Sequence, residues 1–365
     1  MPRVTVLMPL FNAERHVGAA IESILRQTYR DFELIIVEDG STDRSRQIAQ
    51  SYQDPRIRVL VNERNIGLAA SLNRGLAASR GEFIARQDND DLSDPERLDR
   101  QVAVMAVRPE LALLGSQAHA IDEEGRALRP IDRPTDEISI RWYGFFDNPF
   151  VHTSVMFRRA LVWDGDVHGY SDLAYAEDYA LWSSVMRHHP VANLADRLVT
   201  FRVRSTSMMG SLETMTLDRL RSTGFPEIVR RLVRDNIVRA FGSHVSDEEA
   251  MLMSGFVLGV PVDRLDQFLA VFQRLLELYT SADPAFRRTP DFDRTVARQF
   301  DAIAYRLTPA RRRAALRVYM AALRADPGVV WRLSWPRAAA LLLFGREGRA
   351  WITAKTATAA KILFN

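Results

Sequence analysis

Cysteine is absent from this chain of 365 residues. Its absence excludes disulfide bonds, thiolate catalysis and cysteine-ligated zinc, and it is consistent with a reducing compartment. No apolar run approaches the ~20 residues of a membrane-spanning helix. The chain passes from Met1-Pro2-Arg3 directly into a predicted strand, so no signal peptide is visible and we expect a cytoplasmic protein.

Lysine is nearly absent as well, because it occurs only at Lys355 and Lys361, and the formal net charge is +3. The arginine run at 311–313 has no interleaved aromatic residues, which argues against a nucleic-acid partner. Two glycine-rich motifs are also missing. No Gly-x-Gly-x-x-Gly follows the first predicted strand and there is no Walker-type glycine-lysine loop, so dinucleotide binding and P-loop phosphoryl transfer are disfavoured.

The first part of the chain alternates short apolar runs with helical stripes of apolar residues. This alternation predicts a parallel sheet covered by helices. Strands are predicted at 4–8, 32–37, 57–61 and 81–85, and helices at 13–27, 43–51 and 65–77. A further strand is predicted at 111–115, a polar hairpin over 115–129, and a last strand followed by a loop over 199–207.

Each of the first four predicted strands ends in a polar or glycine-containing turn. The turns are Phe11-Asn12, Glu38-Asp39-Gly40, Asn65-Ile66-Gly67 and Asp88-Asn89-Asp90. Because the carboxyl ends of parallel strands lie at one edge of a sheet, the four turns together predict a nucleotide-binding crevice. Taken singly, each is also an ordinary turn.

The last of these turns concentrates three carboxylates, Asp88, Asp90 and Asp91, between a buried strand and a helix start. Water or a cation must relieve such crowding of like charge. Hard oxygen ligands that leave positions open suit Mg²⁺ or Mn²⁺ held together with the phosphates of a substrate. The alternative is a solvated acidic turn that caps the following helix.

Four segments resemble, in order and spacing, the successive motifs of glycosyltransferase family 2. They are 6–12, 38–43, 65–68 and 85–91. The resemblance implies an α/β chain with a GT-A fold, which is Rossmann-like with a mostly parallel sheet. It also implies a nucleotide-sugar donor, usually a UDP-sugar, and a divalent metal, Mn²⁺ or Mg²⁺, on the diphosphate.

The same resemblance implies roles for single residues on the donor side. Asp39 would read the uracil edge, Asp88 would lie near the ribose and Asp90 would bind the metal. The other residues expected to bind the nucleotide-sugar are Pro9, Phe11, Asn65, Gly67 and Asn89.

On the acceptor side, Glu177-Asp178 resembles the family's Glu-Asp motif, whose aspartate is the catalytic base, and Glu177 is expected to contact the acceptor. A carboxylate at a helix N-terminus stays ionised and aimed at a fixed point, as a base requires. The helix dipole is also a sufficient reason for two acids there.

Residues 148–159 resemble the strand that closes the family's acceptor site. Within them, His152 is either a substrate contact or a strand-end histidine bonded to backbone. Trp182 is either a platform for the sugar or a core residue.

Arg204 departs from the family pattern, because family members often carry a metal-ligating histidine at this position. Arginine cannot ligate a metal. Metal binding then rests on Asp90, the diphosphate and water, or Arg204 itself neutralises the diphosphate. Ser207 fits a phosphate contact.

The resemblance ends near residue 210, so we expect a GT-A catalytic domain at 1–210 and an all-helical accessory domain at 211–365. The accessory helices are predicted at 217–240, 247–258, 264–279, 292–306 and 309–324.

The C-terminal segment 328–365 combines Trp331, Trp335 and Trp351 with six cationic side chains and the single acid Glu347. This composition suits a helix lying at a membrane interface, which would bring the chain to the inner face of the membrane as a peripheral protein. The alternative is a helix packed on the accessory domain.

Together these features predict an inverting glycosyltransferase, with inversion implied by the family. It would act on a hydroxyl of a glycan or lipid-linked acceptor in cell-surface polysaccharide synthesis. One alternative is a sugar-nucleotide nucleotidyltransferase, although the loop after the first strand lacks the glycine and lysine that would hold a triphosphate. Another is a non-catalytic carbohydrate-binding protein on a transferase fold.

Overall fold

The computed structural model describes residues 1–204, 224–283, 286, 288–307 and 318. The chain divides into two compact units, which are described separately below. The catalytic unit joins Met1–Gly144 to Asn148–Ile228. The helical unit joins Phe145–Asp147 to the described residues from Val229 onwards. The predicted boundary at 210 lies outside the described residues.

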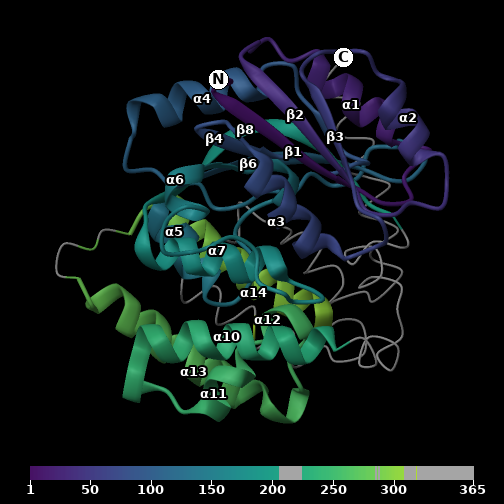
Figure 1. Ribbon diagram of the computed structural model, residues 1–365. Helices are drawn as coiled ribbons and strands as arrows, with labels where there is room; N and C mark the ends of the chain where they lie inside the picture. Colours follow the sequence, from purple (N-terminus) through teal and green to yellow (C-terminus); the bar gives the residue numbers. More distant parts are fainter. Residues whose placement is uncertain (205–223, 284–285, 287, 308–317, 319–365) are drawn as a thin grey trace, which may run out of the picture. The chain divides into compact units, whose positions relative to one another are not determined.

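An eight-stranded sheet in the order β3-β2-β1-β4-β7-β6-β8-β5 forms the centre of the catalytic unit (Figure 1). The pairs among β1 to β4 are parallel, as is β6 with β8. β7 runs antiparallel to β4 and β6, and β5 runs antiparallel to β8. The strands are β1 (Val4–Leu10), β2 (Phe32–Glu38), β3 (Ile57–Val61), β4 (Phe83–Arg86), β5 (Leu92–Ser93), β6 (Leu113–Ile121), β7 (Met156–Arg158) and β8 (Val191–Arg202). The predicted α/β architecture with a parallel N-terminal half is confirmed.

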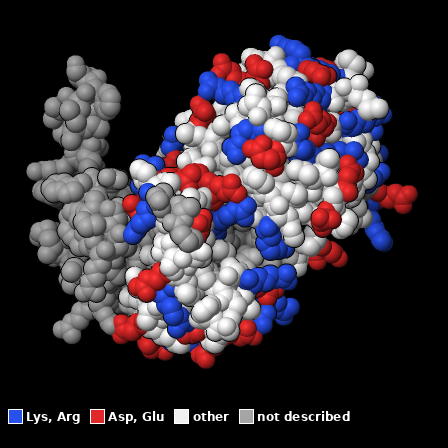
Figure 2. Space-filling model, turned by 90° about the vertical axis from the view of Figure 1, so that its left-hand side faces the viewer, with Lys and Arg blue, Asp and Glu red and all other residues white. Residues whose placement is uncertain are grey.

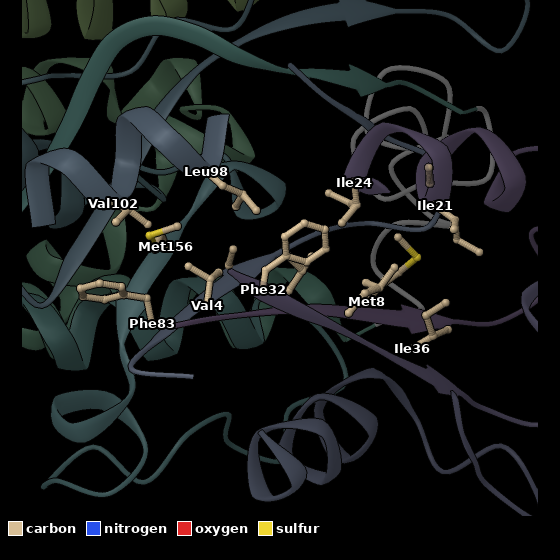
Figure 3. Packing of buried hydrophobic residues seen from close by; sticks show 14 of the residues in the cluster. Val4, Met8, Ile21, Ile24, Phe32, Ile36, Phe83, Leu98, Val102 and Met156 are labelled. Carbon is tan, nitrogen blue, oxygen red and sulfur yellow. The ribbon is translucent and has the colours of Figure 1, made fainter. Parts of the chain in front are cut away.

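β1 lies between β2 and β4, and all of its residues are buried. Because its side chains alternate between the two faces of the sheet, they enter two different cores. Val4, Val6 and Met8 pack against apolar residues of α1, α2 and α4 (Figure 3). Leu7 packs with residues of α3, α5 and α7. The helices are α1 (Val17–Leu25), α2 (Ser45–Ser51), α3 (Leu68–Ala78), α4 (Arg97–Val107), α5 (Glu137–Gly144), α6 (Arg159–Val162) and α7 (Glu177–His188).

The polar hairpin predicted at 115–129 is present, because Ala118 bridges Ile131 and Ile121 bridges Ala127 in the antiparallel sense, while β6 itself extends to Ile121 and pairs with β8. Two other sequence predictions in the second half of the catalytic unit need correction. β8 itself begins at Val191, not at 199. In the segment 148–159 only Met156–Arg158 is a strand, and His152–Ser154 forms the short 3-10 helix η1. These pairings join segments far apart in the sequence, so local periodicity did not reveal them.

The helical unit is built around a cluster of phenylalanine rings. Phe256 lies 5.0 Å from Phe268 and 5.1 Å from Phe272 between ring centroids, and Phe272 lies 4.9 Å from Phe300. Its helices are α11 (Asp247–Leu252), α12 (Gly255–Leu258), α13 (Leu265–Ser281), α14 (Pro290–Leu307) and, from Val229 onwards, α10 (Phe225–Phe241).

Four of the five predicted accessory helices are thus found, but the one predicted at 247–258 is two shorter helices, α11 and α12. The helix predicted at 309–324 and the segment 328–365 lie outside the description, apart from residue 318. Among the described helices, none is long and apolar enough to cross a membrane. On the face in Figure 2, basic and acidic side chains are interspersed over the described residues.

Candidate active site

The turns after β1 and β2 are bonded to each other. Asn12, with a φ of 47°, accepts a hydrogen bond at Oδ1 from Thr42 N (2.9 Å), and its own N–H donates to Ser41 Oγ (3.2 Å). Phe11, one of the expected donor contacts, is 42% exposed. The turn therefore presents an aromatic ring to solvent at the carboxyl edge of the sheet.

Asp39 follows β2 and organises the loop that precedes α3. Its Oδ1 accepts from Ile66 N (2.8 Å) and from Asn62 Nδ2 (2.7 Å), and its Oδ2 accepts from Gly67 N (3.0 Å). Gly67 has a φ of 92°, a conformation that L side chains rarely adopt. The expected base-reading carboxylate and the loop at 65–67 thus form one hydrogen-bonded unit.

Position 40, directly after Asp39, requires a glycine for two reasons. Its φ is 72°, and a Cβ on it would lie 2.7 Å from Asn65 N. Real Cβ atoms do not approach backbone so closely, so a side chain here would push away the loop at 65–67. The Asp39-Gly40 pair of the sequence motif is therefore a packing requirement of the loop as well as a candidate contact for a ligand.

A buried arginine forms an ion pair with the acidic turn after β4. Arg86 is 1% exposed and its Nη2 lies 2.7 Å from Asp88 Oδ1. Burial opposes ionisation of Asp88, but the Arg86 guanidinium holds the pKa of that carboxyl below its usual range. In the same turn, Asn89 Nδ2 donates to the carbonyl of Pro9 (3.0 Å), which is a buried residue within β1.

Asp90 is 9% exposed, and its Oδ2 lies 2.7 Å from Arg204 Nε. Burial and the charge of Asp88 raise the pKa of Asp90 to about 6, against the opposing effect of Arg204. Asp91 is fully buried and accepts at Oδ1 from the backbone N–H of Arg202 (2.7 Å). Burial and its two acidic neighbours raise the pKa of Asp91 well above its usual value. Asp91 is therefore a structural member of the turn.

Within the described residues, no group of three or more histidine and carboxylate side chains could hold a metal ion. The acidic turn offers one carboxylate, Asp90, whose raised pKa reflects burial beside the negative charge of Asp88. This donor set fits a divalent cation that takes its other ligands from substrate phosphates and water. Ser207, the expected phosphate contact, lies outside the described residues.

The second carboxylate centre lies at the start of α7. Ala176 precedes this helix with a φ of 56°, an uncommon conformation for a residue with a side chain. Asp178 Oδ2 accepts from Asn148 Nδ2 (2.8 Å), and Asp178 Oδ1 accepts from Tyr179 N (2.7 Å). The carboxylate is thus held by two donors in one orientation, from which it can accept a proton.

Glu177, the neighbour of Asp178, is 9% exposed. Burial, and then the charge of Asp178, raise the pKa of Glu177 to about 8. At neutral pH its carboxyl is therefore mostly protonated and can donate a hydrogen bond, whereas an ionised carboxylate can only accept.

His152 lies next to both carboxylate centres. Its Nε2 is 3.0 Å from Tyr170 Oη and its Nδ1 is 3.9 Å from Asp178 Oδ2. Burial, and then the charge of Arg86, lower its pKa to about 3, so the ring is neutral. Its neighbour Thr153 accepts from Asp88 N (3.0 Å), so η1 joins the acidic turn to the acceptor side. The histidine is bonded to a side chain and not to backbone.

Trp182 is fully buried. Its ring centroid lies 5.8 Å from Phe157, 6.1 Å from His152 and 6.2 Å from Tyr170. Its burial supports the second of the two expected roles, that of a core residue. The ring packs against His152 and Tyr170 of the site.

Sequence reasoning missed three side chains that hold the site. Arg97 is buried and donates to Gln87 Oε1 (3.1 Å) and to the Arg86 carbonyl (2.8 Å). Burial, and then the charge of Arg86, lower its pKa to about 9. The sequence feature that could have revealed Arg97 is its place as a charged residue among the core-facing positions of α4. Asn148 and Tyr170 gave no local signal, because their partners are distant in the sequence.

The sequence of this chain is similar to those of known glycosyltransferases. Residues 5–165 match the family model for Glycosyl transferase family 2. The amylovoran biosynthesis glycosyltransferase AmsE of Erwinia amylovora is 34% identical over 206 residues, which cover 55% of this chain and 76% of AmsE. EpsE of Bacillus subtilis (strain 168) is 40% identical over 160 residues, which cover 43% of this chain and 56% of EpsE. The chain belongs to glycosyltransferase family 2.

Two solved structures share the fold at low sequence identity. Staphylococcus aureus TarS 1-349 in complex with UDP-GlcNAc has a TM-score of 0.53 and 19% identity, covering 92% of each chain. The mannosyltransferase PcManGT of Pyrobaculum calidifontis, in complex with GDP-Man and Mn²⁺, has a TM-score of 0.50 and 17% identity, covering 90% of this chain and 87% of the other. The predicted GT-A fold is confirmed.

Proposed function

We propose that this chain transfers a sugar, with inversion, from a nucleotide-sugar to a hydroxyl of a glycan or lipid-linked acceptor in cell-surface polysaccharide synthesis. A UDP-sugar is the proposed donor. The observation that carries the proposal is that η1 joins two carboxylate centres, since Thr153 bonds to Asp88 and His152 lies 3.9 Å from Asp178. Asp88 and Asp90 are paired with arginines, and across η1 Asp178 is held at the start of a helix.

On the donor side, the exposed Phe11 ring and the loop organised by Asp39 form the proposed site for the base and ribose. Asp90 would hold Mn²⁺ or Mg²⁺ together with the donor diphosphate, and the metal supplies Lewis-acid stabilisation of the leaving group. Arg204 contributes a further positive charge beside Asp90, which favours a bound diphosphate over a neutral ligand. The use of a metal is also supported by PcManGT, which has a similar fold and was solved in complex with GDP-Man and Mn²⁺.

On the acceptor side, Asp178 takes the proton of the attacking hydroxyl while Asn148 keeps its carboxylate in place. Glu177, protonated at neutral pH, donates a hydrogen bond to an acceptor oxygen. The neutral His152 contributes an uncharged polar surface beside them.

A donor panel tests the proposal. Release of nucleoside diphosphate would be measured with UDP-glucose, UDP-galactose, the UDP-N-acetylhexosamines, GDP-mannose and dTDP-rhamnose. We expect hydrolysis of a UDP-sugar that depends on Asp178. Formation of a sugar nucleotide from UTP and a sugar 1-phosphate would favour a nucleotidyltransferase instead. Tight sugar binding without turnover of any donor would favour a carbohydrate-binding protein.

We also propose that the segment 328–365 contacts anionic membrane lipid, on the basis of its composition. Three tryptophans and a formal charge of +5 suit the interface of a membrane. Peripheral contact at the inner face of the membrane would place a cytoplasmic transferase beside a lipid-linked acceptor.

A further inference from the structure

Three residues in the middle of the catalytic sequence belong to the helical unit. The chain leaves the catalytic unit after Gly144, and it returns at Asn148. The tripeptide between them, Phe145-Phe146-Asp147, clusters with the helical unit. Such an excursion has no local sequence reason, because α5 has just ended and no turn motif requires two adjacent phenylalanines.

The two phenylalanine rings of the tripeptide pack among rings of the helical unit. Phe146 is fully buried, with centroids 4.8 Å from Phe256 and 5.7 Å from Phe272. Phe145 lies 5.3 Å from Phe241 and 5.7 Å from Tyr279, both edge to face. Aromatic pairs in these tilted and edge-to-face arrangements stabilise the packing beyond the area that they bury. The tripeptide is therefore firmly anchored in the helical unit.

Both residues that flank the tripeptide are bonded to the first turn of α7. On one side, the carbonyl of Gly144 accepts from Tyr179 Oη (2.9 Å). On the other side, Asn148 Nδ2 donates to Asp178 Oδ2 (2.8 Å). Gly144 also packs closely on α7, because a Cβ there would lie 2.6 Å from Met186 Cε. Consecutive residues of α7, Asp178 and Tyr179, are thus bonded to the two residues of the catalytic unit that flank the tripeptide.

We propose that the helical unit positions the proton-accepting carboxylate of Asp178 through this tripeptide, with Phe146 as the anchor and Asn148 as the positioning residue. The inference rests on the proposed function and deepens it, because it gives the helical unit a part in the same reaction. Asn148 is suited to positioning Asp178, because the oxygen and the nitrogen of its side-chain amide both form hydrogen bonds. Its Oδ1 accepts from Phe150 N (3.0 Å), which leaves Nδ2 aimed at Asp178.

The consequence is a specific loss of catalysis when the anchor is removed. Without the Phe146 ring, the tripeptide loses its contacts with Phe256 and Phe272, and Asn148 is expected to fix the carboxylate less well. A misplacement of about 1 Å at a reacting group can cost up to ~10²-fold in rate. The donor-side turns after β1, β2 and β4 belong to other segments of the chain, so donor binding should remain.

The first experiment compares Phe146→Ala with Phe268→Ala. Phe268 is a matched control because it is equally buried in the ring cluster of the helical unit, 5.0 Å from Phe256, but lies outside the tripeptide. The probe is the panel donor that the wild-type chain hydrolyses fastest. We expect Phe146→Ala to lower kcat at least tenfold with KM for the donor within twofold. Phe268→Ala should leave kcat within twofold. Equal kcat losses in the two variants, or no loss in Phe146→Ala, would overturn the inference.

Hydrogen exchange provides a readout that needs no substrate. In Phe146→Ala the peptide that contains the first turn of α7 should exchange faster than in the wild type, and in Phe268→Ala it should not. If Phe146→Ala does not fold, Phe146→Leu is the variant to measure, since it keeps an apolar anchor but loses the ring contacts. Unchanged exchange in a folded Phe146 variant would contradict the inference.

A double-mutant cycle then tests whether the effect passes through Asn148. Asn148→Ala should lower kcat about as much as Phe146→Ala, and adding Phe146→Ala to it should lower kcat by less than twofold further. Contacts that act in series are non-additive in this way. Multiplicative losses would mean that Phe146 acts by another route and would reject the assignment of Asn148.

Asp178→Asn separates failure of the inference from failure of the proposed function. Turnover close to wild type in Asp178→Asn would reject the proposed function, whatever the result for the Phe146 variants. An inactive Asp178→Asn, together with Phe146→Ala indistinguishable from Phe268→Ala, would leave the proposed function intact and reject only the coupling.

Discussion

Arg204 Nε lies 2.7 Å from Asp90 Oδ2. This ion pair connects the segment that follows β8 to the acidic turn after β4. The carboxylate that the family resemblance assigns to the metal therefore already has a cationic partner. This pair has consequences for the binding of a diphosphate that can be measured.

Arg204→Ala should weaken the affinity for UDP at least tenfold and the affinity for uridine by less than twofold, because the guanidinium interacts with phosphate charge and not with the base. Isothermal titration calorimetry measures both constants. Arg100→Ala is a control, since Arg100 forms an exposed ion pair with Glu96. Equal weakening of UDP and uridine would place the action of Arg204 away from the phosphates. Arg204→His should increase the dependence of UDP binding on Mn²⁺.

Asp90→Asn keeps the size of the side chain but removes the charge that would hold a cation. We expect the enhancement of donor binding by Mn²⁺ to disappear and turnover to fall by ~10² or more, as when a group that stabilises transition-state charge is removed. Calorimetric titrations of the donor with and without Mn²⁺ check this. The same Mn²⁺ enhancement in Asp90→Asn as in the wild type would contradict the role of Asp90.

Asp178→Asn should lower kcat by at least ~10² while KM for the donor changes little, because a general base acts on the acceptor proton and not on donor binding. Steady-state rates over a range of donor concentrations separate the two constants. Glu177→Gln should lower kcat less, since its amide keeps a hydrogen-bond donor. A rate close to wild type in Asp178→Asn would show that this carboxylate only caps α7.

Glu177 also makes the stability of the protein depend on pH. Its pKa rises from the ordinary 4.5 to about 8 on folding, so between these values the native state holds a proton that the unfolded state has lost. Stability from this group is complete below pH 4.5 and is lost as the pH rises toward 8. Glu177→Gln removes the titration. We therefore expect its Tm, relative to that of the wild type, to be higher at pH 8 than at pH 5.

Differential scanning calorimetry of both proteins at the two pH values measures this difference. Glu63→Gln is the control, because Glu63 is exposed in the described structure. A Glu177→Gln shift in Tm of the same size at pH 5 and pH 8 would show that Glu177 is not protonated in the native state.

The proposed membrane contact is tested by liposome flotation. The intact chain should float with anionic vesicles at low salt, and a chain truncated after Asp326 should remain at the bottom of the gradient. Cations near an anionic leaflet contribute about 1 kcal/mol each, so high salt should release the intact chain. If both chains stay at the bottom, the segment 328–365 does not bind anionic lipid.

Much of the fold was predictable because its signals are local. β1, β2 and β3 are apolar runs between helical stripes, and the polar turns that follow them have recognisable composition. The family was recognisable for the same reason, since each of its motifs lies within a few consecutive residues. Prediction failed where pairing is long-range, as in β8, whose paired residues in β6 are about eighty positions earlier in the chain.

The sequence by itself determined which residue types meet at the carboxyl edge of the sheet, since the order of strands and helices along the chain and the composition of the turns follow from periodicity and motif spacing. Only the tertiary structure decided how they are paired. Arg204 on Asp90, Arg97 beneath the acidic turn and Asn148 on Asp178 each join segments that chain folding brings together. The burial that raises the pKa of Glu177 to about 8 is likewise a property of the packed molecule, because desolvation comes from neighbours and not from the residue itself.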